Sequence, residues 1–177
     1  AKKLIGKEPF AVVLPDMLIS KNKGNAGDSL KKMKKNFEIH ETSSLLLGKV
    51  KKTDISKYGI VKIRENLKSP ELGFIEKIIE KPSIKKAPSD LYAVGRYIFT
   101  NDFFKYLSKV KPDKSNEIQL TDAIDFFIKD NKKVYAFPLD GKIFDCGENI
   151  QLILANLEFA MKDPLMRSQI KNYLKKK

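Results

Sequence analysis

The amino-acid sequence predicts a layered α/β domain, in which a mostly parallel β-sheet is flanked by helices and interrupted by one β-hairpin. Apolar stretches of strand length alternate along the chain with segments of helical periodicity. In the middle, residues 59–63 and 73–79 carry alternating β-branched side chains on either side of a polar stretch, as expected for the two arms of a hairpin. The 177 residues, 42% of them hydrophobic, are sufficient for a single domain, 1–177, with a substantial core.

The first half of the chain contains two apolar stretches that we expect to be buried strands. Residues 10–14 form a continuous apolar run, typical of a strand covered on both faces, and residues 43–50 form a second one. Between them, Asp28 can cap a helix with one apolar side. That side consists of Leu30, Met33 and Phe37. Residues 91–99, after the hairpin, are again typical of a strand.

The second half contains three expected helices. Residues 117–129 and 150–161 have helical apolar periodicity, and Pro164 starts a final basic helix. N-terminal capping explains the acids and the glutamine of 117–122. Two short strands are expected around a turn, at 134–139 and 142–144. We expect the apolar side of each helix to pack against the core.

Cysteine and histidine are too scarce for several kinds of chemistry. The single cysteine, Cys146, cannot form an intramolecular disulfide, which favours a reducing, cytoplasmic setting. No histidine lies near Cys146 in the sequence to act as a base, so we do not expect it to be a nucleophile. The single histidine, His40, excludes a mechanism that needs two, and structural zinc usually takes four Cys or His ligands. Any metal must therefore be held by carboxylates, which suits Mg²⁺.

The formal net charge of +13 makes nucleic-acid binding an alternative function. Arginine, which grips guanine bidentately, occurs only at positions 64, 96 and 167, and the other basic residues are lysines spread along the chain. This distribution favours ordinary solvated lysines over a nucleic-acid partner, although phosphate-bearing small molecules are polyanions too. No apolar run approaches the roughly 20 residues needed to cross a bilayer, so we expect no membrane partner.

Two aspartates stand where predicted strands end. Asp16 follows the apolar run 10–14, and Asp145 lies between a short strand and the start of a helix. Ligands of open α/β sheets collect at the carboxyl ends of strands, so each acid is well placed to hold a metal. The alternatives are structural: Asp16 as a turn residue that bonds its own backbone, and Asp145 as a helix N-cap.

Four further residues are candidates for ligand contact. Glu80 and Lys81 end the hairpin, and we expect Pro82 to hold Lys81 in an extended conformation, with the two charged side chains on opposite faces. Gly59 and Gly95 lie at strand ends or interiors, where a glycine allows a ligand to approach closely. The alternatives are a surface ion pair for the charged residues and a bulge or bend for the glycines.

Several motifs follow one another along the chain. They are Leu14-Pro-Asp16, Lys57-Tyr-Gly-Ile60, Glu80-Lys-Pro82 with Ala87-Pro-Ser89, Val94-Gly-Arg-Tyr97, Glu117-Ile-Gln-Leu-Thr-Asp-Ala123 and Phe144-Asp-Cys-Gly147. Their succession, from about Pro9 to Asn172, resembles the bacterial UTP–glucose-1-phosphate uridylyltransferases, also called UDP-glucose pyrophosphorylases. The last two motifs are the most specific.

The resemblance implies a sugar nucleotidyltransferase with a Rossmann-like mixed sheet. It implies that Asp16 and Asp145 hold Mg²⁺ against the nucleotide phosphates. Glu80 would bind glucose hydroxyls and Lys81 would meet the phosphates, while Gly59 and Gly95 would line the sugar pocket.

The resemblance also implies a reaction. A glucose 1-phosphate oxygen attacks the α-phosphorus of UTP in line, which gives UDP-glucose and pyrophosphate, and no protein base is needed because the nucleophile is already an anion. The family further implies a cytoplasmic enzyme of carbohydrate metabolism that forms homo-oligomers.

One part of the family's pattern is missing from the chain. The glycine-rich loop Gly-x-Gly-Thr-Arg-Phe, which binds the triphosphate and uracil in the family, has no counterpart among the nine glycines. We therefore expect the chain to be a carboxyl-terminal part of such an enzyme, inactive or nearly so alone. The alternative is a basic nucleic-acid-binding module, whose affinity for DNA would fall steeply with salt.

Overall fold

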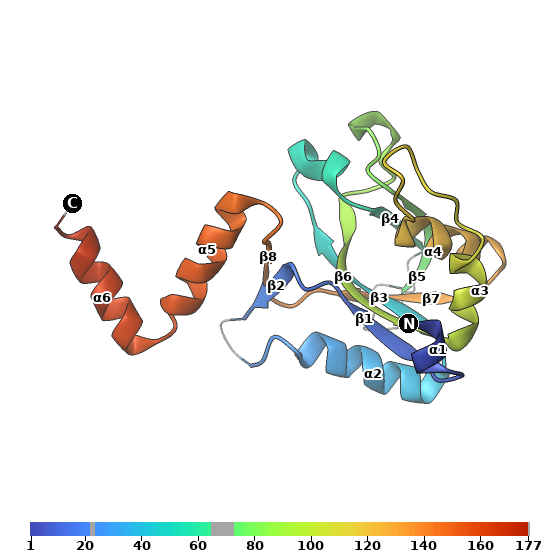
Figure 1. Ribbon diagram of the computed structural model, residues 1–177, viewed down its shortest axis with the longest axis horizontal. Coiled ribbons are helices and arrows are strands. Elements are labelled where there is room, and N and C mark those ends of the chain that lie inside the picture. Colours follow the sequence, from blue (N-terminus) through green and yellow to red (C-terminus); the bar gives the residue numbers. More distant parts are fainter. Residues whose placement is uncertain (22–23, 65–72, 177) are drawn as a thin grey trace. The chain divides into compact units, whose positions relative to one another are not determined.

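The computed structural model describes residues 1–21, 24–64 and 73–176. Contacts divide the chain into two compact units. Residues 1–13 and 29–139 form the first unit, and residues 14–28 and 140–177 form the second. Figure 1 labels the elements of both. No helix within the described ranges combines the length and the hydropathy that a bilayer-spanning segment requires.

A six-stranded mixed sheet forms the centre of the first unit. Its order is β1 (Phe10–Val13), β6 (Leu91–Phe99), β3 (Ser43–Lys49), β7 (Val134–Pro138), β5 (Gly73–Ile79) and β4 (Ile60–Arg64). The α/β class and the hairpin of β4 and β5 are confirmed. The balance of strand directions differs from the expectation, because β3 with β7 is the one parallel pairing among the described residues. A parallel pair needs a long crossover, and the segment between β3 and β7 includes helix α4 (Leu120–Lys129).

Strand β1 lies at the edge of the sheet, so the prediction of a strand covered on both faces is wrong. It pairs with β6, and its residues alternate between half-buried and exposed. The Phe10 ring stacks on Phe104 with the centroids 4.6 Å apart, whereas Val13 is 49% exposed. The apolar run therefore marks a strand that buries only one face.

The main core lies between one face of the sheet and the helices α3 (Phe104–Leu107) and α4. Aromatic rings dominate it: Phe103 stacks on Phe99 with the centroids 3.8 Å apart, and Phe127 meets Phe103 edge-on. Ile124 and Phe127 are buried, which confirms the apolar side predicted for this helix. Large buried rings fix the position of α4 against the sheet.

Helix α2 (Asp28–His40) lies along the other face of the sheet (Figure 1). The His40 ring is 5.6 Å from the ring of Tyr135 in β7. Met33 is fully buried as predicted, while Leu30 and Phe37 are half-buried. The remaining helical segments among the described residues of the first unit are α1 (Lys2–Ile5) and three 3-10 turns. The turns are Lys52–Lys57, Ile84–Lys86 and Asn101–Phe103.

The second unit is a two-stranded antiparallel ribbon followed by two helices. Its elements are β2 (Met17–Ser20), β8 (Lys142–Asp145), α5 (Asn149–Ala160) and α6 (Pro164–Leu174). The predicted strand at 142–144 is confirmed, but it pairs with β2 and belongs to a different sheet from its neighbour β7. Phe144 and Ala155 are buried within this unit.

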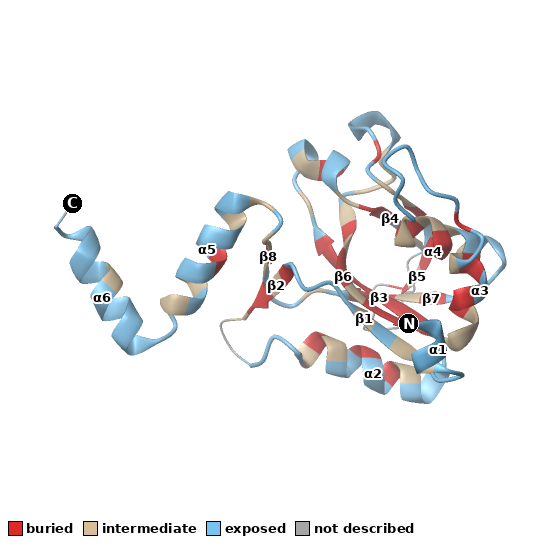
Figure 2. Cartoon of the chain, viewed as in Figure 1, coloured by how far each residue is buried: buried red, intermediate tan, exposed pale blue. Residues whose placement is uncertain are grey.

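Helix α5 does not bury its apolar stripe in the described part of the chain, which contradicts the prediction. Ile150, Ile153, Leu154 and Leu157 are between 41% and 62% exposed, and α5 and α6 are mostly pale blue in Figure 2. The side of α5 that contacts the ribbon carries Glu158, whose carboxylate accepts hydrogen bonds from Ser20 Oγ at 2.8 Å and Lys142 Nζ at 3.3 Å. This polar contact joins α5 to the ribbon, whereas the leucine stripe stays exposed in the described part of the chain.

Candidate functional site

The hairpin brings two of the predicted residues to the same end. Gly59 directly precedes β4 and Glu80 directly follows β5, and the first residue of β4, Ile60, pairs with the last residue of β5, Ile79. Helix α4 begins beside them: Thr121 Oγ1 donates a hydrogen bond to Glu80 Oε2 at 2.9 Å. A carboxylate, a glycine and a helix start therefore meet at one corner of the first unit.

Gly59 is a glycine because of this crowding. A Cβ at position 59 would lie 2.7 Å from Thr121 Cγ2 and 3.1 Å from Glu80 Oε2. The missing side chain lets the threonine and the carboxylate pack directly against the backbone. Within the described chain these side chains take up that space, and the close approach of a ligand to Gly59 stays a prediction.

The Glu80 carboxylate is partly removed from water. Burial raises the pKa of Glu80, while the hydrogen bond from Thr121 and the charge of Lys81 lower it, and the charges of Asp122 and Asp113 raise it. Its side chain is 22% exposed, and Oε1 lies 3.8 Å from Lys81 Nζ. One carboxylate oxygen is bound by the protein, and the other faces the lysine.

Lys81 has a left-handed backbone with φ of 41°, so the predicted extended conformation is wrong. Its N–H donates to the Tyr58 carbonyl at 3.1 Å, which turns the chain out of β5. The steric effect of Pro82 disfavours the right-handed helical region for the residue before it, and the left-handed turn also avoids that region. The turn brings the Lys81 and Glu80 side chains together instead of placing them on opposite faces.

Gly95 lies in a β-bulge of strand β6. The register of β3 with β6 shifts between Leu45 and Leu47, and Gly95 has φ of 72°, a conformation that favours glycine. Two residues later, burial and the nearby charge of Glu80 raise the pKa of the Tyr97 hydroxyl. The bulge thus belongs to the surroundings of Glu80, and Gly95 itself fits the bulge alternative.

Asp16 and Asp145 lie side by side on the ribbon of the second unit. Met17 pairs with Asp145, and Cys146 N–H donates to the Asp16 carbonyl at 2.8 Å. A Cβ built on Gly147 would lie 3.1 Å from Asp145 Oδ1 and 3.8 Å from Asp16 Oδ2, so both carboxylates flank one point. Asp16 precedes β2 rather than ending a strand of the main sheet.

The two carboxylates form a donor set that fits a hard divalent cation. Mg²⁺ is usually held by one or two protein carboxylates together with substrate phosphates and water. Asp145 accepts a hydrogen bond from Gly147 N–H at 3.1 Å, and Glu148, not Asp145, is the N-cap residue of α5. Among the described residues, no group of three or more His, Cys, Asp or Glu side chains is arranged to hold a metal. A site here would need phosphate oxygens to complete it.

Sequence reasoning missed the role of the segment before α4. The acids and the glutamine of 117–122 do not cap the helix: Gln119 Nε2 donates to Asp113 Oδ2 at 2.8 Å, and no side-chain hydrogen bond caps α4. Thr121 contacts Glu80, 41 residues away. A threonine in a first helical turn has no sequence signal for such a contact, because it depends on where the helix packs.

Asp113 organises the loop that leads to α4. The hydrogen bonds from Gln119, Glu117 N–H and Ser115 N–H lower the pKa of its carboxyl to about 2. A lowered folded-state pKa means that this stabilisation is present above the unfolded value and is lost as the pH falls toward 2. We therefore expect Asp113→Asn to lower the urea midpoint at pH 6, with a difference from the parent that shrinks between about pH 4 and pH 2. A difference that stays constant with pH would contradict this role.

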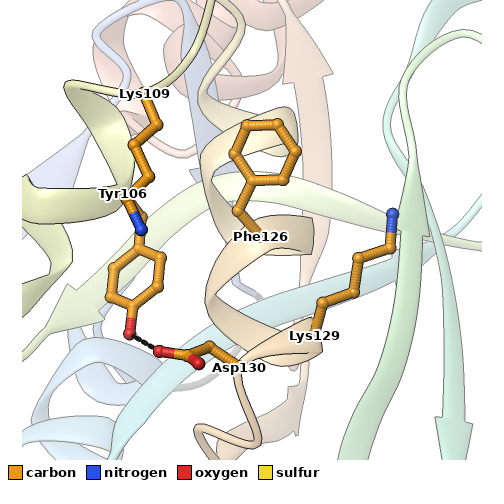
Figure 3. A pocket seen from close by; sticks show the side chains of 5 residues that line it. All are labelled: Tyr106, Lys109, Phe126, Lys129 and Asp130. Carbon is orange, nitrogen blue, oxygen red and sulfur yellow. Dashed lines mark hydrogen bonds between the residues drawn. The ribbon is translucent and has the colours of Figure 1, made fainter.

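A separate hollow lies between α3 and α4, with a volume of about 360 Å³ (Figure 3). It is lined by Tyr106, Lys109, Phe126, Lys129 and Asp130. Tyr106 donates a hydrogen bond to Asp130, and Lys109 Nζ lies 5.1 Å from the centre of the Tyr106 ring. None of the residues predicted for the site lines this hollow.

Comparisons with known proteins match nearly the whole chain. Residues 1–162 match the family model described as "Nucleotidyl transferase". The chain is 38% identical over 176 residues to the UTP–glucose-1-phosphate uridylyltransferase of Haemophilus ducreyi, covering 98% of this chain and 59% of that protein. It is 34% identical over 174 residues to the enzyme of that name from Streptococcus pneumoniae, covering 98% and 58%.

Solved structures give the same picture. A UDP-glucose pyrophosphorylase complexed with UDP-glucose has a TM-score of 0.81 at 38% identity, over 92% of this chain and 60% of that one. A UTP-bound UGPase from Acinetobacter baumannii has a TM-score of 0.82 at 30% identity, over 98% and 58%. The chain thus spans less than two thirds of the length of each of these relatives.

Proposed function

This chain belongs to the nucleotidyl transferase family, and we propose that it carries the sugar-phosphate side and the metal carboxylates of a UTP–glucose-1-phosphate uridylyltransferase. The observation that carries the proposal is the half-buried Glu80 carboxylate beside Gly59 and Lys81. Residues 1–177 are proposed to be one portion of the catalytic domain. The relatives and the solved structures reported above support this reading.

The proposed sugar contact follows from the geometry of Glu80. Oε2 accepts from Thr121, and Oε1 points toward Lys81, so Oε1 is the oxygen that sugar hydroxyls would reach. Hydrogen bonds from neutral hydroxyls to a partly desolvated carboxylate are among the stronger ones in proteins. Lys81 Nζ would then lie next to the phosphate of glucose 1-phosphate, as the charge of that group favours.

We propose that Asp16 and Asp145 would hold Mg²⁺ with the nucleotide phosphates. When bound, the ion would supply charge neutralisation and orientation of the phosphates. The reaction needs no protein base, because the attacking phosphate oxygen of glucose 1-phosphate is already anionic. Lys81 contributes a fixed positive charge where two polyanions must approach each other.

The remaining parts of the proposal concern the whole enzyme. UTP and glucose 1-phosphate are its substrates, UDP-glucose and pyrophosphate its products, and it acts in the cytoplasm as a homo-oligomer. The 177 residues contain no Gly-x-Gly-Thr-Arg-Phe loop. The chain alone is therefore expected to bind UDP-glucose weakly and to form little or none from UTP and glucose 1-phosphate.

The proposal is tested by replacing Glu80 with glutamine in this chain. We expect Glu80→Gln to weaken UDP-glucose binding about 10- to 100-fold, because hydrogen bonds to a charged acceptor contribute roughly 1.5–3 kcal/mol. Binding is measured by NMR titration in the presence of MgCl₂. The matched control is Glu76→Gln, which removes an exposed glutamate of the same strand β5, paired with Lys62.

Equal affinities of the parent and Glu80→Gln would overturn the assignment of the sugar site. A parallel loss in Glu76→Gln would show that the loss is not specific to Glu80, because removing a carboxylate makes this basic chain more positive and by charge alone would favour the anionic ligand. Robust UDP-glucose synthesis by the chain alone would show that the glycine-rich loop is dispensable.

A further inference from the structure

Thr121 makes two different contacts at the corner of the hairpin. Its hydroxyl donates to Glu80 Oε2 at 2.9 Å, and its methyl carbon occupies the space over Gly59 that a Cβ would fill. Thr121 is buried, with 8% of its surface exposed, and it lies in the first turn of α4, whose buried Ile124 and Phe127 fix the helix against the core. The hydroxyl therefore has little freedom to leave the carboxylate.

From this geometry we propose that Thr121 is a positioning residue, which holds one oxygen of the Glu80 carboxylate so that the other is presented to the hydroxyls of the hexose. The inference rests on the proposed function, because it assigns a task to Thr121 within the same sugar site. Without the hydroxyl, the Glu80 side chain could rotate about its terminal bond, since carboxylate torsions are broad. Pre-organised acceptors lose less conformational entropy when a ligand binds.

Charges of both signs lie around the Glu80 carboxylate. Lys81 attracts the carboxylate, whereas Asp122 and Asp113 repel it. The negative charge of Glu80 also helps to raise the pKa of the buried Tyr97 hydroxyl. The neutral Thr121 hydroxyl fixes the carboxylate without removing its negative charge.

The test is a double-mutant cycle on the chain, with UDP-glucose and MgCl₂ as the probe. We expect Thr121→Val, which keeps the shape and removes the hydroxyl, to weaken binding about tenfold. Thr121→Ser should regain most of the affinity. In a Glu80→Gln background, Thr121→Val should have little further effect, because a residue that acts through Glu80 has nothing left to position.

A second measurement follows Glu80 directly. In ¹³C-labelled chain, Thr121→Val should raise the pKa of the Glu80 carboxyl, because a hydrogen bond that favours the charged form is lost. The control is Thr53→Val, because the Thr53 hydroxyl also donates to a carboxylate, Asp54 Oδ2, at 3.3 Å. It should change neither the affinity nor the Glu80 titration.

The outcomes separate the inference from the function on which it rests. If Glu80→Gln weakens binding but Thr121→Val does not, or if Thr121→Val weakens binding equally in both backgrounds, the positioning role is wrong and the sugar site stands. If the Glu80 titration is unchanged in Thr121→Val, the positioning role is also wrong. If neither Glu80 nor Thr121 affects binding, both proposals fail.

Discussion

Replacing Lys81 with alanine is expected to lower kcat about 100-fold or more in a longer uridylyltransferase that carries this chain, comparable to losing one pre-organised electrostatic donor. The turn at Lys81, with φ of 41° and its N–H bonded to the Tyr58 carbonyl, fixes where the side chain leaves the backbone. Alanine also has a Cβ, so this variant has the same backbone preference at position 81 and removes only the side-chain atoms beyond Cβ, including the ammonium group. The measurement is steady-state formation of UDP-glucose from UTP and glucose 1-phosphate.

Two further variants sharpen the interpretation of Lys81. Lys85→Ala removes an exposed lysine four residues away and should leave kcat within about twofold, since isolated surface charges contribute little. Lys81→Arg keeps the charge but changes a compact ammonium into a planar fork, so only partial activity is expected. Near-normal turnover of Lys81→Ala would refute the assigned role.

The second large effect is expected at the acid pair of the ribbon. Asp145→Asn and Asp16→Asn should each lower turnover of the longer enzyme by about 100-fold or more, because a metal at phosphates contributes several kcal/mol of charge stabilisation. Asparagine keeps the size of the side chain, and its carbonyl can still accept the Gly147 N–H bond that Asp145 accepts at 3.1 Å. The variants therefore remove negative charge with little change in shape.

Binding of Mn²⁺ to the chain, followed by water-proton relaxation with and without UDP-glucose, measures the same site without turnover. We expect each variant to weaken the binding of Mn²⁺ in the presence of UDP-glucose. Asp163→Asn is the control, because Asp163 caps α6 through Met166 N–H in the same unit and asparagine caps equally well. Unchanged Mn²⁺ binding in Asp145→Asn and Asp16→Asn would remove the acid pair from the proposal.

Most strand and helix positions followed from local pattern, although the strand β2 was not expected, and strand direction did not follow from it. Residues 91–99 form a strand as expected, and the strand expected at 43–50 ends at Lys49. An apolar run has the same appearance in a parallel strand and in a central antiparallel strand, however, so the sequence could not distinguish β6 from a parallel neighbour. Nor could it show that the run 10–14 lies at an edge, because edge position depends on which strands pair.

In the candidate site, too, local pattern predicted some features, and others depend on contacts between distant parts of the chain. Gly59 and Glu80 come together because a hairpin joins them, which local pattern predicts. The left-handed turn at Lys81 depends on a hydrogen bond to Tyr58, and the contact of Thr121 with Glu80 depends on the packing of α4. Such long-range geometry has no signature in composition or spacing. The acid pair was expected at the main sheet, and the structure places it on a separate ribbon.

The leucine and isoleucine stripe of α5, which is exposed in the part of the chain that the structure describes, has a practical consequence for solutions of this chain. With a net charge of +13, molecules repel one another at low ionic strength, which opposes association through exposed apolar side chains. At about 1 M salt the Debye length shrinks to about 3 Å, and that repulsion no longer acts beyond contact. We therefore expect the chain to stay dispersed in buffers of low ionic strength, and we expect high salt to promote association through the exposed side of α5.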